Sequence, residues 1–436
     1  MTPLLAGLSL FAALVALVRL GLHVPIALVL CAWAGTWAMK GSEALAAKLL
    51  ALTALDAISH YHFGVVPLFV LMGQLVAASG MGRDAFDAAS ALFGRVRGGL
   101  AVGTIGANAV FATISGVSIA SAAVFARVAV PEMLRHGYRA RFAVGLVAGS
   151  SVLGMLIPPS LLLILYAILA EQSVGALFVA GLGPGLLLTA LFALGVVLMA
   201  RFVPGFVGRD LRPAGERRPG AAYLARRLVP ILALLALVLG GIGFGLFTPI
   251  EASAVGATAA FAIALARGTL DRRTLVHVLG ETATVTANVC FLIIAAQMFA
   301  RTLALSGLPA SLGDWVAAAG IGYWGVLIAY VTFLVALGTV LDAASTILVA
   351  VPLMLPLAIG MEFDLVWFGI VTVLAAEVGL LTPPFGLSVF VIESTLKDET
   401  ITIGDIFAGA APFAAIVLVA LALVMAFPAI ALAPLG

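Results

Sequence analysis

The chain has 436 residues and a formal net charge of +2 at pH 7; 64% of its residues are hydrophobic and only 10% are charged. Soluble domains carry about 25% charged and about 45–50% apolar residues, so this composition excludes a water-soluble globular protein. The apolar runs are continuous, without the polar–apolar alternation of a membrane barrel, and this favours helices that cross the bilayer. We therefore expect an all-α polytopic membrane protein with no nucleic-acid partner.

The first half of the chain is predicted as apolar helices separated by polar turns. We expect helices over residues 4–21, 25–39, 65–78, 142–169 and 173–200, and an amphipathic segment near a membrane surface over residues 83–99. The last of these helices contains Gly181, Gly183, Pro184 and Gly185. Because Gly and Pro weaken or interrupt a helix, these residues predict a boundary or a break.

A basic stretch divides the sequence into two parts. Residues 201–227 hold seven arginines against two acidic residues, and arginine-rich loops lie on the cytoplasmic side of a membrane. We interpret these arginines as determinants of topology and not as ligand contacts. The stretch is expected to join two approximate repeats, residues 50–200 and 275–427, within one transmembrane domain over residues 1–436.

A helix start is predicted at Thr248-Pro249-Ile250-Glu251. The Thr is the expected N-cap, the Pro takes the first helical position and the Glu completes a capping box, which explains this Glu without a ligand. Further on, we expect a Gly-rich turn over residues 305–313 and a last span over residues 410–427. In total, ten to twelve spans and two segments that enter the membrane and turn back are expected.

Two interrupted apolar segments with matching spacing are the main functional signal. The first runs from Ser115-Gly116-Val117-Ser118 to Pro158-Pro159, and the second from Gly338-Thr339 through Asp342 to Pro383-Pro384. In each, a Val-Ala-Val-Pro sequence follows the turn, and a glycine lies four residues before the Pro-Pro pair. Broken helices at corresponding places in two halves indicate the binding site of a secondary transporter. The alternative is that they are ordinary kinks and small-residue packing sites.

The residue types at these breaks suit the binding of ions and anions. A backbone that leaves helical geometry in a membrane offers carbonyl oxygens to a cation and a helix N-terminus to a carboxylate. Additional hydroxyl oxygens come from Ser115, Ser118, Ser121, Thr339, Ser345 and Thr382. Asp342 shares its turn with Gly338 and is the better predicted cation ligand, whereas Glu377 either binds an ion or pairs with a buried polar group.

The sequence contains no phosphate-binding loop, catalytic triad or cluster of metal ligands. We therefore expect neither an enzyme nor an ATP-driven pump, and no cofactor or metal other than a coupling ion. A secondary carrier or a channel remains.

A series of short motifs runs in one order over nearly the whole chain. They are Gly21-Leu22-His23-Val24-Pro25-Ile26-Ala27, Pro67-Leu68-Phe69-Val70-Leu71-Met72-Gly73, Gly98-Gly99-Leu100-Ala101, Ser115-Gly116-Val117-Ser118, Gly137-Tyr138, Ile157-Pro158-Pro159-Ser160, Thr248-Pro249-Ile250-Glu251-Ala252, Gly338 with Asp342, and Gly379-Leu380-Leu381-Thr382-Pro383-Pro384. In these motifs the chain resembles the large membrane subunit of the tripartite ATP-independent periplasmic (TRAP) transporters.

The resemblance implies a multi-pass protein of the bacterial cell inner membrane with two inverted repeats, each carrying a re-entrant helical hairpin. It implies a scaffold and an elevator-type transport domain, and Na⁺ symport of carboxylates such as C4-dicarboxylates or sialic acid. It also implies two partners, a small four-helix membrane subunit and a periplasmic substrate-binding protein. Since no small subunit is fused to this sequence, that partner is expected to be a separate chain.

The resemblance also assigns roles by position: Ser115, Gly116 and Ser118 form the first hairpin tip, and Gly338 and Asp342 lie on an unwound helix facing the hairpins. The residues expected to bind the ion are Ser115, Gly116, Ser118, Gly338, Asp342, Thr382 and Pro383. The residues expected to bind substrate are Asn108, Ser121, Pro158, Pro159, Ser160, Thr339, Ser345 and Pro384.

Two positions depart from the family pattern. Val117 stands where the family often has Ser, and Ala375 stands where many members have Asn, so each departure removes a polar side chain near the expected site. Two other functions stay open at this point. One is a stand-alone ion-coupled carboxylate transporter that needs no binding protein, and the other is a membrane scaffold or channel without a coupled site.

Overall fold

The computed structural model describes residues 3–59, 64–93, 98–116, 118–208, 220–384, 386–396 and 400–435. These ranges are helical, as predicted, and contain an isolated bridge between Tyr138 and Gly208 but no strand. Within them, six helices are long and apolar enough to cross a membrane, or eight if each of two bent helix pairs counts as one span. The expected ten to twelve spans exceed this number, and six further apolar helices within these ranges have 10–17 residues.

The chain begins with four helices that lead to a sharp bend. They are α1 (Pro3–Arg19), α2 (Val24–Lys40), α3 (Glu43–Ser59) and α4 (Val65–Ala78). At Gly80, whose φ is +77°, the chain turns by 64° into α5 (Met81–Phe93). Helix α5 buries Met81, Ala85 and Ala88 on one face, so it is amphipathic, as predicted.

The first predicted break lies between two helices, and the first Pro-Pro pair interrupts the next segment. The helices here are α6 (Gly99–Ser115), α7 (Ser118–Arg135), α8 (Ala140–Ser151), α9 (Leu153–Leu156), α10 (Leu161–Ala170) and α11 (Val174–Phe202). The segment 140–156 and α10 meet at an angle of 42° around Pro158-Pro159. The predicted helix over residues 142–169 is therefore broken by the prolines.

Helix α11 is continuous, so the break predicted at its glycines is wrong. Its glycines serve close packing instead. A Cβ atom on Gly181 would lie 2.8 Å from the carbonyl oxygen of Leu156, and one on Gly185 would lie 2.6 Å from a side-chain carbon of Ile157. These glycines bring α11 directly against the chain that precedes the first Pro-Pro pair.

The middle of the chain connects the two halves. Its elements are α12 (Pro204–Val207), α13 (Ala221–Leu235), the π-helix η2 (Ala236–Gly240), α14 (Gly241–Gly243) and α15 (Pro249–Ala266). The predicted basic loop over residues 201–227 is therefore partly helical, and residues 209–219 lie outside the described residues. The predicted capping box is confirmed: Glu251 accepts the Thr248 N–H at 2.8 Å, and Thr248 Oγ1 accepts the Glu251 N–H at 3.3 Å.

The second half of the chain begins with the longest helix among the described residues. Its helices are α16 (Arg272–Ser306), α17 (Leu308–Ala318), α18 (Tyr323–Gly338), α19 (Ala343–Gly360), α20 (Leu365–Leu380), α21 (Leu387–Leu396), α22 (Ile403–Ala426), α23 (Ala429–Leu432) and the 3-10 helix η3 (Ala433–Leu435). The expected turn over 305–313 is confined to Gly307 at φ +74°. The last span begins at Ile403, because Thr402 and Asp405 form a second capping box.

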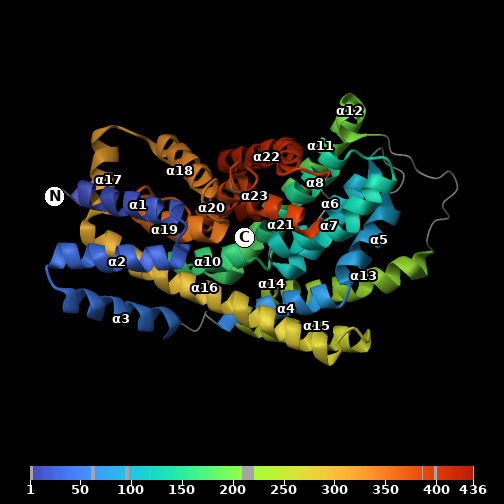
Figure 1. Cartoon of the computed structure of the whole chain (residues 1–436), viewed down its shortest axis with the longest axis horizontal. Helices are drawn as coiled ribbons and strands as arrows, with labels where there is room; N and C mark the ends of the chain where they lie inside the picture. The colour runs from blue at the N-terminus through green and yellow to red at the C-terminus, as the bar shows by residue number, and fades with distance from the viewer. Residues whose placement is uncertain are drawn as a thin grey trace.

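The two halves pack against each other reciprocally. Figure 1 shows α5 to α8 toward one end of the molecule and α17 to α19 toward the other, with α10, α20 and α21 between them. Helix α10, which follows the first Pro-Pro pair, packs on α19, and α21, which follows the second, packs on α7. Each short helix thus contacts the helix that follows the break of the other half.

An ionic cluster anchors the bend between α4 and α5. Asp84 on α5 accepts from Arg227 on α13 at 2.8 Å and from Arg267, which caps α15, at 2.5 Å. Asp87 accepts from Arg227 at 2.5 Å, and Arg267 also donates to the carbonyl of Ser79 at 3.3 Å. Arg227 belongs to the predicted topology-determining stretch, and the structure gives it this additional role.

Candidate functional site

The first break is closed against the first Pro-Pro turn. Helix α6 ends at Ser115, and Gly116 follows with φ of +63°, a conformation that favours glycine. A Cβ atom on Gly116 would lie 2.6 Å from the carbonyl oxygen of Pro159. The Gly116 carbonyl accepts the Leu161 N–H at 3.2 Å. The structure therefore brings together two motifs that are about 40 residues apart in the sequence. Val117, between Gly116 and Ser118, lies outside the described residues.

A small cavity of about 10 Å³ lies at this junction. It is lined by Phe69, Val70, Ile114, Ser115, Gly116, Pro159, Leu161 and Ile164. This is roughly the volume that one water-sized sphere occupies. The hydroxyl oxygens of Ser115 and Ser118 are buried and have no hydrogen-bond partner among the described residues. A buried hydroxyl left unpaired costs about 1–3 kcal/mol, so the fold itself gives no account of these two polar side chains.

Three polar side chains form a buried network beside the break. Asn108 Nδ2 donates to Ser150 Oγ at 2.7 Å, and Ser121 Oγ donates to Asn108 Oδ1. All three residues are fully buried. The network ties α6, α7 and α8 together, which explains Asn108 and Ser121 without a substrate. Sequence reasoning missed Ser150, for which the only signal was a Ser-Ser pair inside an apolar helix.

The other residues of the first Pro-Pro turn are buried in the fold. Ser160 is the N-cap of α10: its hydroxyl accepts the Leu163 N–H at 3.3 Å and donates to the Met155 carbonyl. Pro158 and Pro159 are buried and joined by a cis peptide bond. The hydroxyl of Ser160 is thus occupied, whereas the carbonyl of Pro159 faces the first break.

At the second break, Asp342 begins a helix. It is the N-cap of α19, and its carboxylate accepts from both the backbone N–H, at 2.9 Å, and the hydroxyl of Ser345. Thr339 Oγ1 donates to the Ala336 carbonyl at 2.8 Å. The break falls where the sequence predicts it, and capping accounts for Asp342 and Ser345 structurally. The carboxylate still has lone pairs to offer, because each of its oxygens can accept more than one bond.

Two glycines bring α18 and α20 into backbone contact at this break. A Cβ atom on Gly379 would lie 2.5 Å from the Cα of Gly338, and one on Gly338 would lie 3.0 Å from the Cα of Gly379. The second break therefore lies against the residues that lead into the second Pro-Pro turn, as the first break lies against the first turn. Pro383 and Pro384, also joined by a cis bond, are exposed, unlike their counterparts in the first half.

Thr382 uses its hydroxyl locally, donating to the Val378 carbonyl at 2.8 Å. Three other polar side chains of this half make no such hydrogen bond. The carboxylate of Glu377 and the hydroxyls of Thr346 and Ser388 are buried without a hydrogen-bond partner among the described residues. The expectation that Glu377 pairs with a buried polar group is therefore not met. A charged carboxylate in an apolar interior is costly, and the described residues give Glu377 no partner that offsets this cost.

Thr346 and Ser388 were missed in the sequence. Thr346 lies next to Ser345 in an apolar run, and Ser388 lies shortly after the second Pro-Pro pair. Among the described residues, no three His, Cys, Asp or Glu side chains come together as a metal site. The available ligands at both breaks are hydroxyl, carbonyl and carboxylate oxygens, which suit hard cations.

Comparison with known proteins identifies a family and several relatives that this chain resembles over most of its length. Residues 11–430 match the family described as "Tripartite ATP-independent periplasmic transporter, DctM component". The chain is 34% identical over 389 residues to the C4-dicarboxylate TRAP transporter large permease protein DctM of Pseudomonas aeruginosa, covering 88% of this chain and 89% of that protein. The corresponding protein of Rhodobacter capsulatus is 31% identical over 444 residues, 98% of each chain. The sialic acid TRAP transporter large permease protein SiaM of Vibrio cholerae is 31% identical over 375 residues, 86% of each.

Two solved transporter structures share the fold. The YdaH transporter of Alcanivorax borkumensis has a TM-score of 0.61 at 14% identity and covers 88% of this chain and 89% of that chain. MtrF of Neisseria gonorrhoeae has a TM-score of 0.61 at 12% identity and covers 86% of this chain and 82% of that chain. At these identities the likeness concerns the fold alone. The family match over nearly the whole chain, with relatives above 30% identity, decides the assignment: this chain belongs to the large permease (DctM) component of the TRAP transporters and is a multi-pass membrane transport subunit, not an enzyme.

Proposed function

We propose that this chain imports an organic carboxylate by Na⁺ symport across the bacterial inner membrane, together with a small membrane subunit and a periplasmic substrate-binding protein. The names of the relatives support the substrate class, since both a C4-dicarboxylate and a sialic acid carry carboxylate groups. The family description as a tripartite periplasmic transporter supports the two partners.

The proposal of a coupling ion rests mainly on the cavity at the first break. Ser115 lines this cavity, and its buried hydroxyl has no hydrogen-bond partner among the described residues. The hydroxyl of Ser118, on the other side of the break, is also buried and unpaired among these residues. The cavity volume of about 10 Å³ suits one monatomic ion or one water. Carbonyl oxygens at helix breaks coordinate Na⁺ in secondary transporters, and the Pro159 carbonyl approaches Gly116 here. We assign the first Na⁺ site to this junction.

The second break supplies a physical reason for coupling. Asp342 places a carboxylate at the N-terminus of α19, where the N–H groups and helix dipole would otherwise favour an anion. A substrate carboxylate approaching this break is repelled unless a cation neutralises Asp342. A second bound cation at Asp342, Gly338 and Thr382 would therefore raise the affinity for the substrate. The reciprocal packing of the two halves supports inverted repeats, with the hairpin-bearing part as the moving domain.

The test is uptake into proteoliposomes that contain this chain and its small subunit, with a panel of labelled carboxylates including succinate and N-acetylneuraminate. Uptake is measured with and without an inward Na⁺ gradient and with and without the binding protein. Ser115→Ala removes one free hydroxyl and should raise the Na⁺ concentration for half-maximal uptake by about tenfold, since one lost ligand costs about 1–2 kcal/mol. Adding Ser118→Ala removes the second free hydroxyl and should raise this concentration further.

Ser253→Ala is the matched control. Ser253 is equally buried, but its hydroxyl donates to the Ile250 carbonyl at 2.6 Å on α15, so its Na⁺ dependence should not change. Asp342→Asn should retain the cap, because an amide oxygen can still accept the Ser345 N–H, and should lose uptake. An uptake rate that is the same with and without the Na⁺ gradient would refute symport. Uptake in the absence of the binding protein would favour a stand-alone carrier.

A further inference from the structure

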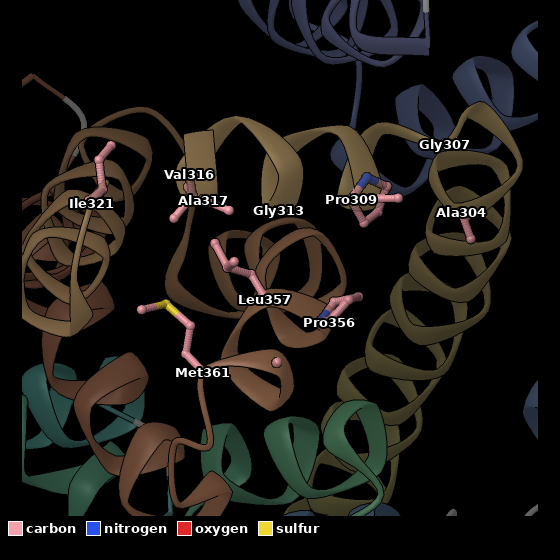
Figure 2. Close-up of a pocket in the computed structure, with 12 residues that line it drawn as sticks. Ala304, Gly307, Pro309, Gly313, Val316, Ala317, Ile321, Pro356, Leu357 and Met361 are labelled. Carbon is pink, nitrogen blue, oxygen red and sulfur yellow. The ribbon is translucent and has the colours of Figure 1, made fainter. Parts of the chain in front are cut away.

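A second cavity, of about 600 Å³, lies at the end of α19 opposite to Asp342. Its walls are the C-terminal turn of α16, helix α17 and the C-terminal half of α19. Figure 2 shows Leu357 of α19 pointing toward Val316 and Ala317 of α17, and Met361, the residue that follows α19, lining the same space. We call this space the α17 groove. It shares no lining residue with the cavity at the first break.

The lining of the α17 groove is apolar throughout. Its twelve residues are Ala304, Gly307, Pro309, Ala310, Gly313, Val316, Ala317, Ile321, Pro356, Leu357, Gly360 and Met361, and none carries a polar side chain. Ordered water needs two to four polar partners, so the side chains here do not hold it. A volume of this size is within the range of about 300–1,000 Å³ that bound organic ligands occupy. The occupant that fits is an apolar chain.

The groove is continuous with the apolar outer surface of the chain. The lining residues that are themselves exposed are Ala304, Ala310, Ala317, Pro356 and Gly360. Large apolar side chains beside them are also exposed, Leu305 by 45%, Trp315 by 58% and Ile359 by 57%. In a multi-pass membrane protein such side chains face lipid, and Trp is enriched at headgroup level. We propose that the α17 groove binds one acyl chain of a membrane phospholipid, which fills the space between α17 and the end of α19.

The structure offers a direct way to close this groove. A Cβ atom on Gly313 or on Gly360 would meet nothing within 4 Å, and neither glycine has a positive φ. A leucine at either position therefore extends into the cavity without displacing backbone. Gly280 of α16 also has open space around its Cβ position but lies outside the groove, so Gly280→Leu is the matched control for added bulk.

The experiment uses the full chain reconstituted in phosphatidylethanolamine and phosphatidylglycerol vesicles. A trace of the phosphatidylethanolamine carries a diazirine near the end of one acyl chain. After illumination, peptide mass spectrometry measures label on residues 304–321 and 356–361, relative to label on α11. Helix α11 exposes Leu186 and Leu194 and reports contact with bulk lipid. We expect groove peptides of the wild-type chain to be enriched over α11, and Gly313→Leu or Gly360→Leu to abolish that enrichment while Gly280→Leu retains it.

Two results would overturn the proposal. The first is wild-type labelling of groove peptides no greater than that of α11, which is decisive even if a leucine variant fails to fold. The second is loss of the groove label when the small subunit is added to wild-type vesicles, which would make that subunit the occupant. Monodisperse elution of each variant establishes that it is folded, and none of these readouts depends on Na⁺-driven uptake.

Discussion

Replacing Asp84 by Asn should destabilise the bend between α4 and α5. The Asp84 carboxylate lies between two guanidinium groups, 2.8 Å from that of Arg227 and 2.5 Å from that of Arg267. The three side chains are only 18%, 26% and 23% exposed. Asn keeps the shape and one hydrogen-bond acceptor but removes the negative charge. Arg267 is then left with the Ser79 carbonyl, and Arg227 with Asp87.

The size of the effect follows from this degree of burial. Exposed ion pairs contribute about 0.2–1 kcal/mol, whereas removing one partner of a fully buried pair costs about 3–5 kcal/mol. The Asp84 cluster lies between these limits, and one arginine keeps another carboxylate. We expect Asp84→Asn to lower the free energy of unfolding by about 2 kcal/mol. The control is Asp56→Asn, because Asp56 and its partner Arg301 are both more than half exposed; its cost should be at most about 0.5 kcal/mol.

The assay is SDS titration of the purified chain in mixed micelles, followed by the fluorescence of its five tryptophans. A double-mutant cycle with Arg267→Gln separates the Asp84–Arg267 interaction from the loss of either side chain. Raising the salt concentration should weaken the Asp56 pair more than the Asp84 cluster, because screening acts mainly on exposed charges. An Asp84→Asn effect no larger than that of Asp56→Asn would refute the reasoning.

Two further predictions concern the candidate site. Gly379→Ala should abolish uptake and lower the free energy of unfolding by about 1–3 kcal/mol, because the new Cβ atom would overlap the backbone of Gly338. The control is Gly280→Ala, which has open space around it and should leave uptake and the thermal midpoint unchanged. Equal behaviour of the two variants would contradict close packing at the second break. Asn108→Ala should lower the thermal midpoint, because Ser121 and Ser150 each lose a buried hydrogen-bond partner, which costs about 1–3 kcal/mol. A thermal midpoint as high as that of the wild type would show that water replaces the amide.

Features that depend on a few neighbouring residues could be read from the sequence. Composition alone predicts membrane helices, because the apolar runs leave too few charges for a water-facing surface. The Pro-Pro pairs predict where α9 and α20 end, and Thr248 with Glu251 predicts the start of α15. The two helix breaks, at Gly116 and before Asp342, were also predicted at the correct positions. Each of these outcomes is decided by the local backbone and by side chains within one turn.

Features that depend on contacts between distant segments could not be predicted from the sequence. The glycines of α11 read as helix breakers, yet they are packing sites against residues near the first Pro-Pro turn. The role of Arg227 requires Asp84, which is 143 residues away in the sequence. The unpaired hydroxyls of Ser115 and Ser118 and the unpaired carboxylate of Glu377 appear only when the surroundings of each atom are known.

Sequence by itself determined that this chain is a bundle of membrane helices with two paired interruptions, and which residue types stand at them. Only the tertiary structure decided which of those polar atoms bond to other parts of the fold, as in Asn108, Ser121 and Ser160, and which have no partner among the described residues. The physical reason is that a hydrogen bond is satisfied by any donor or acceptor that lies within reach. In a chain this long, the partner within reach is set by helix packing and not by the neighbouring residues.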